Sequence, residues 1–117
     1  MSNPPDAKPK MIEIGQQAEA LVAGRIGICA AARRIRDLSF SAFKDPWAQP
    51  ELKIFLVIDS ETDDLPVDRG REHWDPGALK KKDEEIARVD ALYRGQALQA
   101  AQLVLADPRY QVGGDLR

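Results

Sequence analysis

A run from Pro76 to Ala106 constrains the fold more than any other part of the sequence. Asp75 is a good helix N-cap and Pro76 suits the first helical position, whereas the pair Asp107-Pro108 ends the pattern. A helix of this length spans roughly 46 Å, which is long for a small domain, so Gly95 is a candidate position for a bend. Its apolar stripe consists of Leu79, Ile86, Val89, Tyr93, Ala97, Ala100 and Val104.

Two more apolar stripes with helical spacing precede this segment. The first contains Met11, Ile14, Ala18, Leu21 and Val22, and the second contains Ile28, Ala31, Ala32, Ile35 and Leu38. Gly24 and Gly27 lie between them, and two glycines would cost roughly 2 kcal/mol inside one continuous helix. The sequence therefore predicts two helices, at about Pro9–Ala23 and Arg25–Phe43.

The segment after Pro50 has two interpretations. Its apolar run, Ile54 to Ile58, is rich in β-branched residues and has the length of a buried strand. A strand needs a partner, and no second convincing strand follows from the sequence. Pro50 and Glu51 suit the first turn of a helix, so we expect a short buried helix over Pro50–Ser60, with a strand at 53–58 as the alternative.

These elements predict an all-α domain, a compact bundle of about four helices with an acidic loop before the long C-terminal helix. The alternative is an α+β domain containing the strand at 53–58. Prolines and the lack of apolar periodicity predict a disordered tail at 1–10. The helical domain is expected over 11–107, with a C-terminal tail at 108–117 from which Tyr110 or Val112 could still dock on the core.

Composition narrows the function classes. Seventeen Lys and Arg against nineteen Asp and Glu give a net charge of −2, which argues against a nucleic-acid-binding protein. A single cysteine, Cys29, excludes a disulfide framework, and its apolar neighbours predict a buried, unreactive thiol. No apolar run is long enough to span a bilayer, and no signal peptide is evident at the start. We therefore expect a cytoplasmic protein without a cofactor.

The acidity is concentrated between the third and fourth predicted helices. Glu51 to Pro76 contains eight acidic and three basic residues, a local charge of −5. Loops held between rigid elements are common places for function. The candidate site residues of this acidic segment are Asp59, Glu61, Asp63, Asp64, Asp68, Arg69, Arg71, His73 and Trp74.

Two chemical hypotheses for these carboxylates are weak. The alternate acids Asp59, Glu61 and Asp63 resemble the first ligands of a calcium loop, but Asp64 stands where that loop needs glycine and Gly70 where it needs glutamate. General acid–base catalysis by paired carboxylates is the second hypothesis. No phosphate-binding glycine loop or nucleophile elbow accompanies them, which argues against catalysis. A metal-binding or hydrolytic domain that uses Asp59–Asp64 is therefore kept only as the alternative function.

A recognition surface is the preferred hypothesis. Clustered acids beside Arg69, Arg71 and Trp74 suit a protein partner with a basic patch, because complementary charge accelerates association and tryptophan and arginine are common interface anchors. Trp74 is also expected to pack on Leu79 as a hydrophobic staple. A basic group at Arg25, Arg33, Arg34 and Arg36 precedes the acidic segment, and one of these arginines could reach the segment and fix it.

The stretch Phe55–Trp74 also supports a resemblance. Its Ile-Asp-Ser-Glu-Thr-Asp segment, Leu-Pro pair, and arginine and tryptophan before a long helix resemble a group of small bacterial proteins, over most of Gly24 to Leu103. Small acidic proteins of this kind are similar to immunity proteins of bacterial toxin systems, which bind and block a partner. The resemblance implies a non-enzymatic protein-binding module that neutralises a toxin domain.

Overall fold

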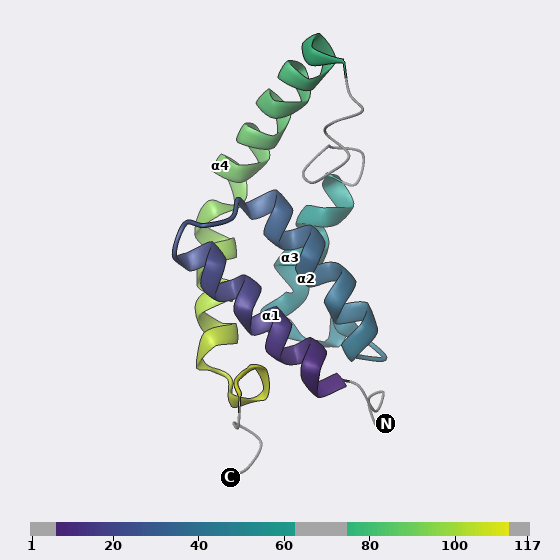
Figure 1. Cartoon of the computed structure of the whole chain (residues 1–117), viewed down its shortest axis with the longest axis vertical. Coiled ribbons are helices and arrows are strands. Elements are labelled where there is room, and N and C mark those ends of the chain that lie inside the picture. Colours follow the sequence, from purple (N-terminus) through teal and green to yellow (C-terminus); the bar gives the residue numbers. More distant parts are fainter. Residues whose placement is uncertain (1–6, 63–74, 113–117) are drawn as a thin grey trace.

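The computed structural model describes residues 7–62 and 75–112, and this part of the chain is an all-α bundle (Figure 1). Its elements are α1 (Ala7–Val22), α2 (Ile28–Ala42), the 3-10 helix η1 (Pro46–Ala48), α3 (Pro50–Glu61), α4 (Pro76–Ala106) and the 3-10 helix η3 (Pro108–Tyr110). The predicted four helices are confirmed, with ends that differ by at most three residues. No strand is present among these residues, so the α+β alternative with a strand at 53–58 is wrong.

The run that resembled a strand is helical because the bundle surrounds α3 on several sides. Leu52, Phe55, Leu56 and Ile58 are buried, and Ile54 packs partly buried against the same core. Apolar side chains are therefore buried around most of this helix. Its sequence for that reason lacks the single apolar stripe, with a period of 3.6 residues, that usually identifies a surface helix. Pro50 begins the helix, as the sequence predicted.

Gly24 and Gly27 lie between α1 and α2, and each separates the two helices in a different way. Gly24 has a φ of +78°, in the left-handed region that glycine adopts without strain. Gly27 is the N-cap of α2, with an extended backbone. Arg25 and Ile26 therefore lie in the connection, and α2 begins at Ile28 rather than at Arg25.

The four helices pack in a closed arrangement, with α2 between α1 and α3 and with α4 against both α1 and α3 (Figure 1). Each helix contributes fully buried residues to one core, including Ile14 and Ala18 from α1, Ala32 and Ile35 from α2, Phe55 and Ile58 from α3, and Ala101 and Val104 from α4. The alanines allow neighbouring helix axes to approach closely. Within the described residues, no helix combines the length and apolar character required to cross a bilayer.

Only the C-terminal part of α4 is fully buried in this core, whereas Ile86, Val89 and Tyr93 pack against it partly buried. Asp75 caps the helix by accepting hydrogen bonds from the backbone N–H groups of Gly77 (3.1 Å) and Ala78 (3.2 Å). The buried residues of α4 nevertheless begin at Ala97. In Figure 1 the first turns of α4 extend past the ends of the other helices. The long helix therefore presents an extended outer surface to solvent.

The 3-10 helix η3, which follows α4, packs on the bundle. Tyr110 in η3 is buried, and its ring packs 6.4 Å from that of Phe43. Within the predicted tail at 108–117, the alternative that Tyr110 docks on the core is confirmed, whereas Val112 is exposed and residues 113–117 lie outside the described residues. At the other end, α1 begins at Ala7 rather than at Pro9, because a proline is tolerated in the first turn of a helix.

The contact between α1 and η3 provides a test of this packing. A Cβ atom added at Gly15 would lie 2.4 Å from the carbonyl oxygen of Tyr110, whereas one added at Gly95 would meet nothing within 4 Å. Gly15→Ala should lower the free energy of unfolding by about 1–3 kcal/mol, since backbone must move to relieve the overlap. Gly95→Ala, the matched control on α4, should raise it by about 0.5–1 kcal/mol.

Urea unfolding followed by circular dichroism measures both effects. Equal responses of the two variants would contradict the close approach of α1 and η3.

Candidate functional site

The structure describes two of the nine candidate site residues, Asp59 and Glu61, both in the last turn of α3. The remaining predictions lie outside the described residues: Asp63, Asp64, Asp68, Arg69, Arg71, His73 and Trp74. The hydrophobic staple between Trp74 and Leu79 falls there as well. The described site therefore consists of the end of α3 and the elements that contact it.

Asp59 is held by the basic face of α2. Its carboxylate accepts a hydrogen bond from Arg33 Nε at 3.2 Å, and its second oxygen lies 3.7 Å from Arg36 Nε. Arg33 Nη2 also donates to the carbonyl oxygen of Thr62, which is buried. An arginine of α2 therefore contacts the end of α3 directly before residue 63, where the described part stops, and these contacts neutralise the Asp59 carboxylate within the chain.

Glu61 connects the end of α3 to α4. A hydrogen bond between its carboxylate and the Tyr93 hydroxyl is the main cause that raises the pKa of Tyr93 above its usual value. Glu61 is itself exposed, as is Ser60 beside it. The last turn of α3 therefore carries one buried acid, Asp59, which pairs with α2, and one exposed acid, Glu61.

A groove of about 430 Å³ opens beside Asp59, between α2 and α3. Phe40 and Trp47 on this groove are 48% and 44% exposed, although both are large apolar residues. The Arg36 guanidinium lies over the Phe40 ring, 4.8 Å from its centroid, and pairs with Asp37 at 3.0 Å. The residues that line the groove are Arg33, Arg36, Asp37, Phe40, Trp47, Leu56, Asp59 and Ser60.

Sequence reasoning missed the two aromatic residues of this groove. Phe40 follows Asp37 by three positions on the polar side of α2, and Trp47 follows the helix-initiating Pro46. An aromatic residue on a charged helix face is the signal that would have identified Phe40. Trp47 carried no such signal, because its exposure depends on how η1 joins α2 to α3.

The structure gives no support to the metal hypothesis within its described part. No group of three or more His, Cys, Asp or Glu side chains among residues 7–62 and 75–112 is arranged to hold a metal ion. The third carboxylate of the proposed calcium-like series, Asp63, lies outside this part.

Cys29 behaves as the sequence predicted. It is buried, and burial, with the negative charge of Asp90 as a second cause, raises the pKa of its thiol to about 11. Its Sγ contacts the Ile86 carbonyl oxygen at 3.9 Å. The reactive thiolate is therefore disfavoured at neutral pH.

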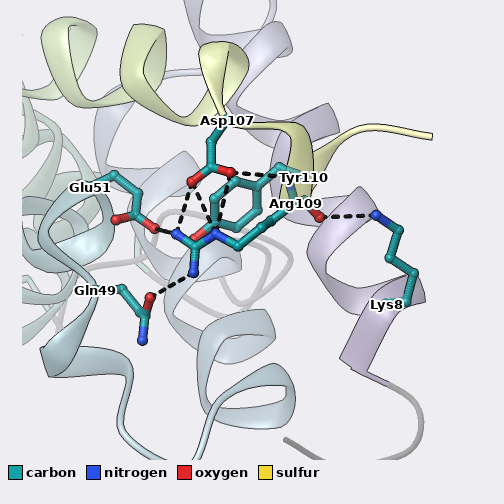
Figure 2. Close-up of polar contacts among 6 residues, drawn as sticks. All are labelled: Lys8, Gln49, Glu51, Asp107, Arg109 and Tyr110. Carbon is teal, nitrogen blue, oxygen red and sulfur yellow. Dashed lines mark hydrogen bonds and ion pairs between the residues drawn. The ribbon is translucent and has the colours of Figure 1, made fainter. Parts of the chain in front are cut away.

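A second polar cluster surrounds the buried carboxylate of Glu51 (Figure 2). We call it the C-terminal clasp, and it consists of Gln49, Glu51, Asp107, Arg109 and Tyr110. Arg109 Nη2 donates to Glu51 Oε2 at 2.7 Å, and the Tyr110 hydroxyl donates to the same oxygen. Arg109 also pairs with Asp107 at 2.8 Å and donates to Gln49 Oε1 at 3.0 Å. The clasp attaches the segment after α4 to the first turn of α3.

Lys8 extends the clasp to α1. Its Nζ lies 3.2 Å from the carbonyl oxygens of both Arg109 and Gln111. Burial, followed by the hydrogen bond to Glu51, raises the pKa of Tyr110 far above its usual value, so this hydroxyl remains a donor. Every member of the cluster is paired within the chain, which indicates a structural role rather than a catalytic one.

Comparisons with models of protein families, with curated proteins and with solved structures found no match. The resemblance to small bacterial proteins and to immunity proteins therefore stays a prediction. We infer function from the groove, from the charge of the acidic segment, and from the residues that position them.

Titration of Asp107 tests the clasp. Hydrogen bonds from the Arg109 side chain are the main cause that holds the pKa of Asp107 below its usual value. A lowered folded-state pKa stabilises the fold above the unfolded pKa of about 4, and this contribution is lost as pH falls through the folded pKa. The stability difference between the wild type and Asp107→Asn should therefore be largest near neutral pH and shrink below about pH 4.

Thermal unfolding from pH 7 to pH 2 measures this difference. Asparagine can still accept the backbone hydrogen bond of Arg109, so the substitution isolates the charge. A difference that stays constant over the whole range would contradict the ion pair.

Proposed function

We propose that the protein acts by binding another protein, and that the groove between α2 and α3 forms the centre of the binding surface. The observation that carries this proposal is the half-exposure of Phe40 and Trp47 in a groove that also contains Arg36. Tryptophan and arginine are the residue types most enriched among interface hot spots. Exposed aromatic residues in a concave, partly charged surface are typical of recognition sites.

The local charge of the acidic segment in the sequence supports a partner with a basic patch. The region Glu51–Pro76 has a local charge of −5, whereas the chain as a whole has −2. Asp59 is paired with Arg33 and Asp37 with Arg36, so attraction of a cationic partner rests on exposed acids such as Glu61. Such charges act mainly on the association rate, while the aromatic residues contribute to the lifetime of the complex.

The paired arginines give Asp59 a positioning role in this proposal. Arg33 and Arg36 hold the last turn of α3 against α2, and this turn forms one end of the groove. The groove is therefore preformed, which reduces the entropy lost on binding. The resemblance to immunity proteins suggests the finer hypothesis that the partner is a bacterial toxin domain and that binding neutralises it.

Substitutions in the groove test the proposal. The partner is first captured with the wild-type chain from a lysate of the native host and identified by mass spectrometry. Trp47→Ala and Phe40→Ala should each raise its Kd at least about tenfold, since truncation of a hot-spot residue costs more than about 1.4 kcal/mol. Glu61→Lys with Asp64→Lys should mainly slow association, and less so at high salt.

Val112→Ala is the matched control, because Val112 is exposed, apolar and distant in the sequence from the groove. It should leave the Kd unchanged within about twofold. Circular dichroism verifies that each variant is folded. A partner that binds the Trp47 and Phe40 variants as tightly as the wild type would contradict the proposal.

A further inference from the structure

The outer face of α4 carries two large apolar side chains that are more than half exposed. Leu92 and Leu103 are 69% and 56% exposed, which makes them the most exposed large apolar residues within the described helices. Gln96 and Gln99 lie between them and are also exposed. The four residues occur at positions i, i+4, i+7 and i+11, so they form a continuous seam along one side of the helix.

This seam is a palindrome. Leu-x3-Gln-x2-Gln-x3-Leu, from Leu92 to Leu103, reads identically in both directions. In two antiparallel copies of this helix, Leu92 of each copy lies opposite Leu103 of the other copy. Gln96 of each copy likewise lies opposite Gln99 of the other. A surface that meets itself in this way satisfies the requirement of a two-fold symmetric interface, in which the same patch occurs on both subunits.

We propose that a second copy of this chain binds along the α4 seam in an antiparallel arrangement. Leu92 then packs on Leu103 of the second copy, and Leu103 packs on Leu92 of the second copy, so that all four leucines become buried. Gln96 faces Gln99 of the second copy, and side-chain amides can donate and accept hydrogen bonds with each other. The seam spacing of four and three residues is that of a coiled coil, whose helices pack in just this manner.

The charges beyond the seam favour the antiparallel arrangement. The same register places Arg88, which is exposed, opposite Asp107 of the second copy. Asp107 already accepts four hydrogen bonds from Arg109, which fill the roughly four acceptor sites of a carboxylate, so Arg88 is attracted to it by opposite charge and not through a new hydrogen bond. A parallel pair would place Arg88 opposite Arg88, with like charges in contact, so charge complementarity selects the antiparallel pair.

The length of the seam sets the strength of the dimer. From Leu92 to Leu103 the helix rises by roughly 16 Å, so the contact is smaller than the roughly 1,600 Å² of a standard interface. We therefore expect a monomer–dimer equilibrium that depends on concentration. Because the groove of the proposed binding surface is formed by α2, η1 and α3, dimerisation through α4 is independent of the proposed function.

Sedimentation equilibrium of the full chain at about 5–500 µM tests the dimer, since weak interfaces dissociate in this range. The average mass of the wild type should rise towards that of a dimer with concentration. Leu92→Glu with Leu103→Glu should remain monomeric throughout, with an unchanged circular dichroism spectrum. Val112→Glu, which adds the same charge at an exposed apolar site outside the seam, should dimerise as the wild type does. A wild type that stays monomeric at every concentration would overturn the proposal.

Disulfide formation then tests the direction of the helices. Leu92→Cys and Leu103→Cys are prepared as separate variants, mixed in equal amounts and air-oxidised. The antiparallel seam predicts a mixed disulfide between the two variants and little product from either alone, because a disulfide requires Cα atoms within about 7 Å. Oxidation of the wild type controls for Cys29, which is buried. Efficient homodimers of Leu92→Cys alone would overturn the antiparallel arrangement.

Discussion

The closure of this bundle depends on one buried carboxylate. Glu51, in the first turn of α3, receives hydrogen bonds from Arg109 and from Tyr110, the residues that follow α4. A buried carboxylate that lost these partners would cost several kcal/mol, so the segment after α4 must remain docked for the fold to be stable. The same segment contacts Gly15 and Lys8 of α1. The segment after α4 therefore contacts both α3, through the ion pair, and α1, through Lys8 and Gly15.

This constraint positions the candidate site as well. The first turn of α3 is fixed by the C-terminal clasp, and its last turn is fixed by Arg33 and Arg36 through Asp59. The groove with Phe40 and Trp47 lies beside the second of these anchors, and Asp59 is one of its lining residues. Electrostatic pairing at both ends of α3 thus holds a partly apolar surface in a defined shape, which is the property that a binding surface needs.

The helices were predictable because their signals are local. Asp75 and Pro76 identify the start of α4, the apolar stripes identify the faces of α1 and α2, and Gly24 identifies the break between them. The clasp was not predictable in the same way, because Glu51 and Arg109 are 58 positions apart. A short polar segment such as 107–112 resembles a tail until a distant partner is known. Trp47 was missed for a related reason, since its exposure depends on tertiary packing rather than on a repeating pattern.

A double-mutant cycle between Glu51 and Tyr110 tests the central claim most directly. Glu51→Gln and Tyr110→Phe are made singly and together, and the free energy of unfolding of each protein is measured in urea. If the buried carboxylate and the hydroxyl stabilise the fold as a pair, the double variant should lose less than the sum of the single losses, with a coupling energy of about 1 kcal/mol or more. Losses that add within about 0.5 kcal/mol would contradict the account, because they would show that the two groups act independently.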